Sequence, residues 1–378
     1  MRIVVANAAY DGSLKTAAAL LDAYHTLTEW SSALTAAGAS VAVVQRFHTT
    51  ARIERDGVSY QFTADREPPW LSTTAAPPAF VGAIASHPAD VVHINGLIFP
   101  QLVAAVRRAI GARTPIVVQH HGGEFPVRGS GLVGMWQRRG WKGGLMAASA
   151  VSFTAAEQAQ PWREAGVLGD QRVLEIVEAS TTLRTVNRTR ARSALSVDAE
   201  PVILWVGRLT TNKDPLTVLA GLEHALPQLP DARVVMVFGD DTLLPVVEQR
   251  IAASELLQRA VVVVGRVPRD EMPNYYGAAD VFVSGSHSEG SGYALIEAMA
   301  SGVVPVVTAI PPFRAIAGDC GQRWPAGDAD AFARALVDVC HGNLATQRAA
   351  TKARFDRDLS WPALAARTIA EYQSLVGG

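Results

Sequence analysis

Val202-Ile203-Leu204-Trp205-Val206 is a run of five apolar residues that opens a series of such runs in the second half of the chain. Longer helix-like stretches separate the later members of the series, which are Val234–Phe238, Val261–Val264, Val281–Val283 and Val303–Val307. A strand that is apolar on consecutive positions is buried on both faces, as in a parallel sheet covered by helices. The series therefore predicts a parallel α/β sheet.

The first half of the chain carries the same alternation. Candidate strands begin at Arg2, Ser40, Val58, Asp90, Pro115 and Ala150. Between them lie helical stretches, such as Leu14–Ala37 before Gly38 and Leu102–Ile110 before Gly111. Two similar α/β domains predict a cleft between them, with the chemistry in the loops that follow the strands.

The length of 378 residues fits two or three domains at about 150 residues each. The stretch Thr181–Glu200 is polar and rich in Arg and Thr, which is typical of a connecting segment. We therefore expect the boundary between the two domains near Leu183.

Composition excludes several classes of protein. The formal net charge is −1, which argues against a nucleic-acid scaffold and against a polybasic membrane anchor. Two cysteines, Cys320 and Cys340, form neither a disulfide framework nor a metal motif. The chain begins with the strand-like run Arg2–Ala6 and holds no apolar stretch of membrane-spanning length, so we expect a cytoplasmic protein.

The most informative motif is Ser286–Gly302, SHSEGSGYALIEAMASG, which predicts a strand end, a loop of small residues and a helix. Gly290 and Gly292 allow a ligand to approach the backbone closely. The first N–H groups of the following helix can bind an anion. The motif therefore indicates an anion site at a strand end.

Two carboxylates lie in this motif. Glu289 is in the loop, and Glu297 is one helical turn after Tyr293. An ionised carboxylate only accepts hydrogen bonds, which suits sugar hydroxyls. Two glutamates eight residues apart could also be solvated surface charges, but the surrounding glycines and the apolar helix favour a functional role.

A second motif, Val206–Asp214, follows the first strand of the second domain. Arg208 leaves the strand end, and Lys213 precedes a helix that opens at Asp214-Pro215. Arg offers a planar fork for phosphate oxygens and Lys a mobile charge, so the pair can neutralise a diphosphate. The alternative is a pair of ordinary surface cations. We expect the two motifs to converge because both follow strands of one sheet.

A third motif, Gln119-His120-His121-Gly122-Gly123-Glu124, follows the strand Ile116–Val118. Adjacent side chains alternate in direction at a strand end, so we expect one histidine to face the cleft. Imidazole exchanges protons near neutral pH and suits a sugar hydroxyl. His121 is the candidate, the alternative being a histidine that packs the loop; no third ligand supports a metal site.

The Glu289–Glu297 segment, the Gly207-Arg208…Lys213 segment and their spacing resemble the retaining GT-B glycosyltransferases with a Glu-x(7)-Glu motif, of the group 1 or family 4 type. The resemblance is strongest over Val202–Thr308. Ser360-Trp361-Pro362 and the helical Leu364–Leu375 are similar to the family's last helix, which crosses back to the first domain. The resemblance implies two Rossmann-like domains facing a central cleft, with residues 1–183 binding the acceptor, residues 184–358 binding the nucleotide sugar and residues 359–378 forming the crossing helix.

The resemblance also implies roles for individual residues. Arg208 and Lys213 would bind the diphosphate of a nucleotide-sugar donor, and Glu297 would hold the ribose hydroxyls. The transferred sugar and its phosphates would face Glu289 and the backbone of Gly290, Ser291, Gly292 and Tyr293. His121 would contact a hydroxyl at the far end of the sugar, and the base would lie near Gly265-Arg266-Val267.

The implied activity is the transfer of a hexose with retention of configuration, with His121, Glu289, Arg208 and Lys213 as the catalytic group. Neither glutamate is assigned as a covalent nucleophile. The cations and the helix N-terminus would stabilise the leaving diphosphate, and no metal or other cofactor is implied. Asp240-Asp241 ends a strand and is interpreted as a turn rather than a metal site. The acceptor could be a small molecule, a lipid or an oligosaccharide.

The sequence departs from the family at two positions. Family members often carry paired glycines after the first strand, whereas Asn7–Ser13 holds only Gly12, which is kept as a candidate donor contact. Ser291 stands where the family has an aromatic residue.

The segment Gly134–Lys142 mixes basic and aromatic residues. It predicts either a peripheral membrane contact around Trp136–Lys142 or an ordinary helix with inward tryptophans.

Three alternative functions differ from sugar transfer in features that can be checked. A nucleotide-sugar epimerase of the same architecture could use Glu289 and His121 as its acid and base, and it would act without an acceptor. A dinucleotide-dependent oxidoreductase needs Gly-x-Gly-x-x-Gly after the first strand, which Met1–Ser13 lacks. A non-catalytic binding protein would hold the nucleotide without turnover.

Overall fold

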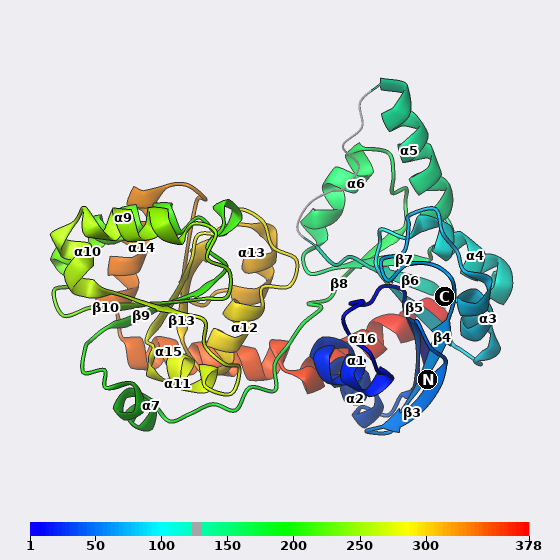
Figure 1. Ribbon diagram of the computed structural model, residues 1–378, viewed down its shortest axis with the longest axis horizontal. Helices are drawn as coiled ribbons and strands as arrows, with labels where there is room; N and C mark the ends of the chain where they lie inside the picture. The colour runs from blue at the N-terminus through cyan, green and yellow to red at the C-terminus, as the bar shows by residue number, and fades with distance from the viewer. Residues whose placement is uncertain (123–130, 378) are drawn as a thin grey trace. The chain divides into compact units, whose positions relative to one another are not determined.

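The computed structural model of the chain describes residues 1–122 and 131–377, with no side chains described for residues 131–133. The chain forms two compact units (Figure 1). Unit 1 is Met1–Ala179 together with Trp361–Gly378, and unit 2 is Ser180–Ser360. The division at Ala179 and Ser180 lies four residues before the expected boundary at Leu183.

Unit 1 is built on an eight-stranded sheet with the order β3-β4-β2-β1-β5-β6-β7-β8. Neighbouring strands are parallel except β3 and β4, which form an antiparallel pair. The strands are β1 (Arg2–Asn7), β2 (Ser40–Phe47), β3 (Ala51–Arg55), β4 (Val58–Ala64), β5 (Val91–Asn95), β6 (Ile116–Gln119), β7 (Ala150–Phe153) and β8 (Arg172–Glu175). The six predicted strands are confirmed, and β3 and β8 were not predicted.

The helices of unit 1 are α1 (Ala17–Ala23), α2 (His25–Ala36), α3 (Pro78–Ser86), α4 (Pro100–Ile110), α5 (Gly131–Leu145), α6 (Gln160–Glu164) and α16 (Trp361–Val376), with a 3-10 turn η1 (Ala156–Ala159). The expectation of one helix over Leu14–Ala37 was wrong. The backbone of Tyr24 leaves the helical region, with φ −94° and ψ 60°, and its hydroxyl accepts a hydrogen bond from the Asp11 amide at 2.7 Å. This contact accompanies the break between α1 and α2.

Unit 2 holds a six-stranded parallel sheet with the order β11-β10-β9-β12-β13-β14. Its strands are β9 (Val202–Gly207), β10 (Arg233–Phe238), β11 (Val261–Gly265), β12 (Val281–Ser284), β13 (Val304–Thr308) and β14 (Gln322–Trp324). The predicted strands are confirmed to within a residue or two, and β14 is an additional edge strand. The strand order reverses between β9 and β12, and ligands of open parallel sheets bind outside the carboxyl ends at such a point.

The helices of unit 2 cover both faces of this sheet. They are α7 (Arg188–Leu195), α8 (Pro215–Ala225), α9 (Leu244–Ala252), α10 (Glu255–Ala260), α11 (Met272–Ala278), α12 (Tyr293–Ala300), α13 (Pro311–Ala317), α14 (Ala329–His341) and α15 (Leu344–Arg354). Short turns are η2 (Thr211–Lys213), η3 (Leu226–Gln228) and the π-helical η4 (Phe355–Leu359). The segment interpreted as a plain connector, Thr181–Glu200, therefore contains the helix α7.

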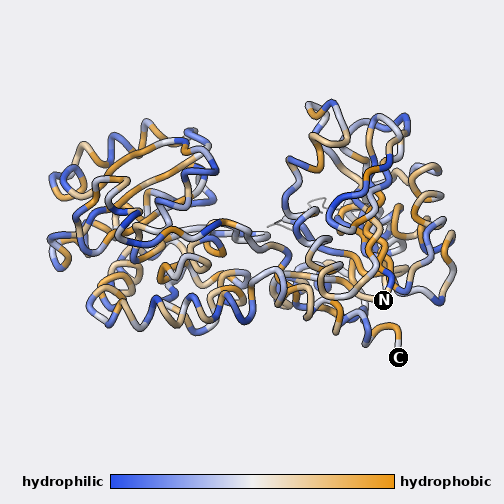
Figure 2. Tube along the Cα trace, turned by 90° about the horizontal axis from the view of Figure 1, so that it is seen from below, coloured by the Kyte–Doolittle hydropathy of each residue, from blue (hydrophilic) through white to orange (hydrophobic). Residues whose placement is uncertain are grey.

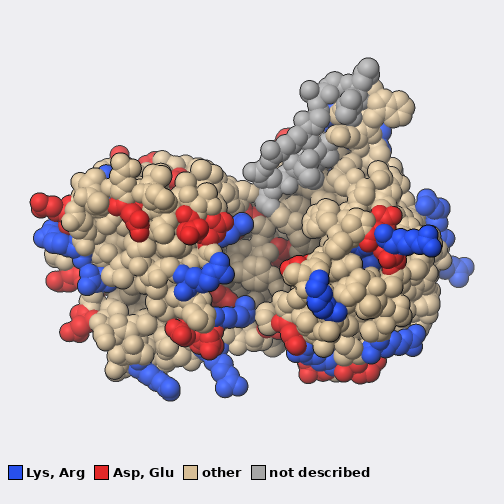
Figure 3. Space-filling view, in the orientation of Figure 1, with Lys and Arg blue, Asp and Glu red and all other residues tan. Residues whose placement is uncertain are grey.

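In each unit, hydrophobic segments run through the interior, and hydrophilic segments lie mostly toward the outside (Figure 2). On the face shown in Figure 3, acidic and basic side chains are interspersed over both units, and neither sign covers a continuous area. This distribution agrees with the near-zero net charge.

The C-terminal helix α16 belongs to unit 1 and packs on α2 (Figure 1). The Tyr372 hydroxyl lies 2.5 Å from His93 Nδ1, and Trp361 Nε1 donates to Glu29 Oε2 at 2.7 Å. Burial of the His93 ring lowers its pKa to about 4. The last helix of the chain is therefore fixed to the first domain by buried polar contacts as well as by packing.

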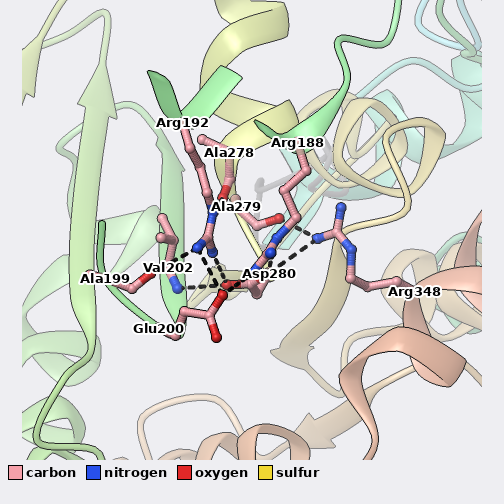
Figure 4. A network of polar contacts seen from close by, with 9 residues as sticks. All are labelled: Arg188, Arg192, Ala199, Glu200, Val202, Ala278, Ala279, Asp280 and Arg348. Atoms are coloured by element: carbon pink, nitrogen blue, oxygen red, sulfur yellow. Dashed lines mark hydrogen bonds and ion pairs between the residues drawn. The ribbon is translucent and has the colours of Figure 1, made fainter. Parts of the chain in front are cut away.

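A buried carboxylate anchors α7 to the sheet of unit 2 (Figure 4). Asp280, only 1% exposed, lies just before β12 and accepts the amide of Val202 at 2.8 Å. Arg192 approaches its Oδ2 at 2.6 Å and Arg188 its Oδ1 at 3.0 Å, and Arg348 of α15 lies 3.7 Å away. This network lies at the amino ends of β9 and β12, so it supports the fold from the sheet edge opposite to the one that ligands use.

Candidate functional site

The loops after β9 and β12 are joined to each other at the switch point of the unit 2 sheet. Asn212 Nδ2 donates to the Ser288 carbonyl at 3.0 Å, and the His287 amide donates to the Asn212 carbonyl at 2.8 Å. His287 Nε2 also lies 2.9 Å from Asp214 Oδ2. These bonds bring the two predicted motifs together at one sheet edge.

Lys213 and Glu289, the central side chains of the two motifs, form an ion pair. Their side chains are 18% and 14% exposed, so the pair is mostly shielded from water. Ser286 Oγ donates to the same oxygen, Glu289 Oε1, at 2.8 Å. The Lys213 backbone is held at the start of α8, where Asp214 caps the helix by accepting the Thr217 amide at 3.2 Å. Both charged groups are therefore held in defined positions.

The helix α12 begins directly after the loop that holds Glu289. Gly292 caps it with φ +62°, a left-handed conformation that side chains rarely adopt. A Cβ at this position would lie 2.8 Å from Ile316 Cδ1, so a larger residue would also require the end of the Ile316 side chain to move. Tyr293 follows and is 44% exposed. The positive end of the α12 dipole thus lies beside the Lys213–Glu289 pair.

Glu297 lies on α12 and has a partner that the sequence did not reveal. The Tyr276 hydroxyl of α11 donates to Glu297 Oε2 at 2.9 Å. Tyr276 is fully buried, and burial together with the charge of Glu297 raises its phenol pKa well above the usual value. Tyr276 therefore stays a neutral donor that orients the carboxylate.

Arg208 lies on the side of the loop nearest to β10. The next residue, Leu209, donates its amide to the Asp240 carbonyl at 2.9 Å. Hydrogen bonds from Thr242, and then the nearby charge of Arg208, lower the pKa of Asp240. Asp240 Oδ1 accepts from the Thr242 amide and hydroxyl at 3.0 and 2.6 Å, which is the geometry of an Asx turn. The exposed guanidinium of Arg208 has no hydrogen-bond partner among the described residues.

A pocket of about 390 Å³ lies at the carboxyl ends of β10 and β11. Its lining residues are Phe238, Gly239, Asp241, Leu244, Val263, Val264, Gly265 and Arg266. Two residues of the predicted base site, Gly265 and Arg266, are among them, and the half-buried Val267 follows. Asp241 was interpreted from the sequence only as part of a turn, whereas the structure places it in the lining of this pocket.

In unit 1 the two adjacent histidines, His120 and His121, differ in exposure, as the alternating side-chain directions at a strand end predict. His120 is 6% exposed and stacks on Phe153 with ring centroids 4.9 Å apart, and burial lowers its pKa to about 4. The His121 side chain is 40% exposed and forms an ion pair with the buried Glu178. Burial lowers the pKa of His121, but the charge of Glu178 and its hydrogen bond raise it more, so the net shift is upward. Gly123 and Glu124 of this motif lie outside the described residues.

Gly12 also lies in unit 1, in the exposed loop after β1. A Cβ on Gly12 would approach Pro69 Cγ to 2.9 Å, and the Tyr10 amide donates to the Pro69 carbonyl at 3.2 Å. Gly12 therefore has a packing role of its own. The other donor-binding candidates belong to unit 2.

The aromatic and basic segment on α5 shows a mixed pattern. Trp141 is buried at 8% exposure, whereas Trp136 is 71% exposed and Met135 40%. Arg139 and Lys142 are exposed on the same helix, which extends from the body of unit 1 (Figure 1). The inward packing expected of an ordinary helix thus applies to one of the two tryptophans.

The described residues contain no cluster of three or more His, Cys, Asp or Glu side chains placed to hold a metal ion. Within the same described part, no helix has both the length and the hydropathy to cross a bilayer.

Comparison with protein families agrees with this architecture. Residues 187–355 match the family described as glycosyl transferases group 1, and residues 25–176 match the glycosyl transferase 4-like domain. The first match covers the Lys213–Glu289 pair, Arg208, Glu297 and the β10–β11 pocket.

Individual relatives extend the comparison over most of the chain. GDP-mannose:cellobiosyl-diphosphopolyprenol alpha-mannosyltransferase of Xanthomonas campestris is 27% identical over 306 residues, which cover 79% of this chain and 77% of the relative. Sucrose-phosphate synthase of Thermosynechococcus elongatus superposes with a TM-score of 0.71 at 19% identity, covering 100% of both chains. The Anabaena protein HepE, solved in complex with UDP, superposes at 0.69 with 16% identity, covering 99% of this chain and 100% of that one. These structures share the GT-B fold, with two parallel-sheet α/β domains.

Proposed function

The chain belongs to the group 1 glycosyl transferases, and from this premise we propose that it transfers a hexose from a nucleoside diphosphate sugar to an acceptor hydroxyl with retention of anomeric configuration. The observation that carries the proposal is the junction of the β9 and β12 loops through Lys213 and Glu289, directly before the N-terminus of α12. A cation and a helix N-terminus together form a site for an anion such as a diphosphate.

Cleavage of the anomeric bond leaves negative charge on the diphosphate. Lys213, Arg208 and the α12 N-terminus stabilise this charge in the proposed mechanism. The fixed positions of Lys213 and the helix N-terminus limit reorganisation during the reaction. Glu289 holds Lys213 in place and faces the transferred sugar. The proposal assigns charge stabilisation to these groups and requires no metal or other cofactor.

Glu297 accepts hydrogen bonds from the ribose hydroxyls in the proposed complex. Tyr276 donates to one of its oxygens and so orients the carboxylate. An ionised carboxylate can accept several hydrogen bonds at once. The family resemblance supports this role, and so does the position of Glu297 on the helix that begins at the anion site.

His121 contacts a hydroxyl of the transferred sugar in the proposed mechanism. The Glu178 carboxylate raises the pKa of this imidazole, so it keeps both ring N–H groups to a higher pH than an isolated histidine. One N–H points to Glu178, and the other can donate to the sugar.

A lipid-linked acceptor is the second part of the proposal. The Xanthomonas relative is named for a cellobiosyl-diphosphopolyprenol substrate. In this chain α5 exposes Trp136 and Met135 beside Arg139 and Lys142, a combination that suits the interface of an anionic membrane. We therefore propose a peripheral membrane contact through α5, which would keep the enzyme on the cytoplasmic side where the nucleotide sugars are.

The experiment that tests the function measures nucleoside diphosphate release from GDP-mannose and UDP-glucose, with and without a cellobiosyl-diphosphate lipid. Acceptor-dependent release, with an α-linked product by NMR, is the expected result. An altered sugar nucleotide formed without acceptor would instead indicate the epimerase. Tight nucleotide binding without turnover on any acceptor would indicate a binding protein. Vesicle sedimentation of the chain and of Trp136→Ala tests the membrane contact.

A further inference from the structure

We propose that the pocket at the ends of β10 and β11 selects guanine, with Asp241 and Arg266 reading adjacent edges of the base; this inference rests on the proposed function. The comparisons do not decide the base, because the Xanthomonas relative is named for GDP-mannose and HepE was solved with UDP. The lining of the pocket in this chain is more informative.

The pocket is open and its lining is partly apolar and partly polar. Phe238, Leu244, Val263 and Val264 supply apolar surface. The register between β10 and β11 shifts after Met236, so that Val237 pairs with Gly265, and this irregularity displaces the strand ends relative to each other. A volume of about 390 Å³ lies within the ordinary range of small-molecule sites.

Two glycines leave additional space in the pocket. No atom lies within 4 Å of the place where a Cβ would be on Gly239 or on Gly265. A flat ring can therefore approach the backbone on both sides. Gly265 also has φ +87°, a conformation that favours glycine.

Two charged side chains of opposite sign supply the polar part of the lining. Arg266 donates one N–H to the Gly239 carbonyl, which fixes its guanidinium across the strand ends and leaves further N–H donors. The Asp241 carboxylate has no hydrogen-bond partner among the described residues. One side chain is thus a fixed donor and the other is an available acceptor.

This pairing matches guanine better than the other bases. Guanine presents two adjacent donors, N1–H and the N2 amino group, which a carboxylate accepts together. Its O6 and N7 are acceptors that a guanidinium binds, the pairing most used for guanine in other contexts. Uracil offers a single N3–H between two carbonyl oxygens that a carboxylate repels, and adenine has an acceptor at N1. Asp241 therefore favours guanine and disfavours both alternatives.

The test is calorimetry of the full chain with GDP, UDP, ADP and IDP, the last of which lacks the N2 amino group. We expect GDP to bind at least tenfold more tightly than UDP or ADP, and IDP to bind more weakly than GDP. Asp241→Asn should weaken GDP binding about tenfold to a hundredfold, as expected for a lost charged hydrogen bond, and should affect IDP less. Asp231→Asn is the matched control, since Asp231 is exposed in the turn at the opposite end of β10.

Equal affinity for GDP and UDP, or unchanged GDP affinity in Asp241→Asn, would overturn the guanine assignment and leave the proposed function intact. Failure of all four nucleotides to bind would overturn the proposed function, and the guanine assignment with it. An equal loss of GDP and IDP affinity in Asp241→Asn would contradict recognition of the N2 amino group.

Discussion

Lys213 of the loop after β9 forms an ion pair with Glu289 of the loop after β12, and Ser286 Oγ donates to the same Glu289 oxygen at 2.8 Å. The pair spans the point where the strand order of the unit 2 sheet reverses. Since ligands of parallel sheets bind at such points, this contact lies where we propose that the diphosphate binds.

Lys213→Ala should lower both nucleotide affinity and turnover. Loss of one preorganised charge typically reduces the rate on the order of a hundredfold, because the leaving diphosphate loses a stabilising cation. Calorimetry with GDP and a turnover assay measure the two effects. Lys352→Ala is the control, since Lys352 forms an exposed pair with Asp356 on another part of unit 2. Wild-type affinity in Lys213→Ala would contradict the diphosphate assignment.

Glu297→Ala should distinguish the ribose from the phosphates. The proposed carboxylate–ribose contact predicts about a tenfold or greater loss of GDP affinity, with little change for inorganic pyrophosphate, which has no ribose. Tyr276→Phe keeps the carboxylate and removes its buried donor, so a smaller loss is expected. Parallel losses for GDP and pyrophosphate in Glu297→Ala would show that Glu297 acts on the phosphates or on the fold instead.

The His121–Glu178 pair should be visible in the pH dependence of the His121 imidazole. Glu178 raises the pKa of His121, so the stabilisation from the pair is fully present below about pH 6.5 and is lost as pH rises through the folded pKa. NMR titration should therefore give His121 a pKa above that of a free imidazole. Glu178→Gln should lower it and move the high-pH limb of the activity to lower pH. An unchanged His121 titration in Glu178→Gln would contradict the coupling.

His121→Ala should keep nucleotide affinity and lose turnover.

Mild acid should destabilise unit 1 through the two buried histidines. Burial lowers the pKa of His93 and of His120 to about 4, so the unfolded chain binds more protons than the folded one between about pH 6.5 and pH 4. Stability falls as pH falls through this window, by up to about 3 kcal/mol for each ring. Urea unfolding at several pH values measures the slope. His93→Gln should reduce the change in unfolding free energy per pH unit. An unchanged pH dependence in that variant would assign the effect to other groups.

Asp280→Asn should destabilise unit 2 strongly. Asp280 is buried beneath two close guanidinium groups, and removal of its charge leaves those cations only the exposed Glu200 as an acidic partner. The expected loss is about 3 kcal/mol, as for other broken buried pairs. Urea unfolding is the measurement, with Asp22→Asn of the exposed Arg55–Asp22 pair as a control that should change little. A loss as small as in the control would show that Asp280 contributes no more than a surface charge.

The central strands could be predicted because their signal is local. Val202–Trp205 and Ile116–Val118 are apolar and buried on consecutive positions, which is typical of strands covered on both faces by helices. The missed strands β3, β8 and β14 are short and lie at sheet edges, with polar residues that resemble loops. Tyr24 interrupts a continuous helical pattern through a contact with Asp11, which local periodicity does not report.

Candidate site residues could be predicted where they lie within a motif. The side chains that contact them could not be predicted. The glycines around Glu289 and the cations Arg208 and Lys213, all expected at strand ends of one sheet, together indicated Lys213 and Glu289 as candidates. Glu178 and Tyr276 meet His121 and Glu297 across 57 and 21 positions of sequence, and nothing near either residue indicates the pairing. Asp241 had a sufficient local explanation as a turn residue, so its place in the pocket became visible only in three dimensions.

A crystal structure of the chain with bound GDP would test the central claim most directly. The account predicts the two phosphates against Lys213, Arg208 and the backbone at Gly292, with the ribose on Glu297. Phosphates bound elsewhere, with Lys213 and Arg208 both in contact only with solvent or protein, would contradict it.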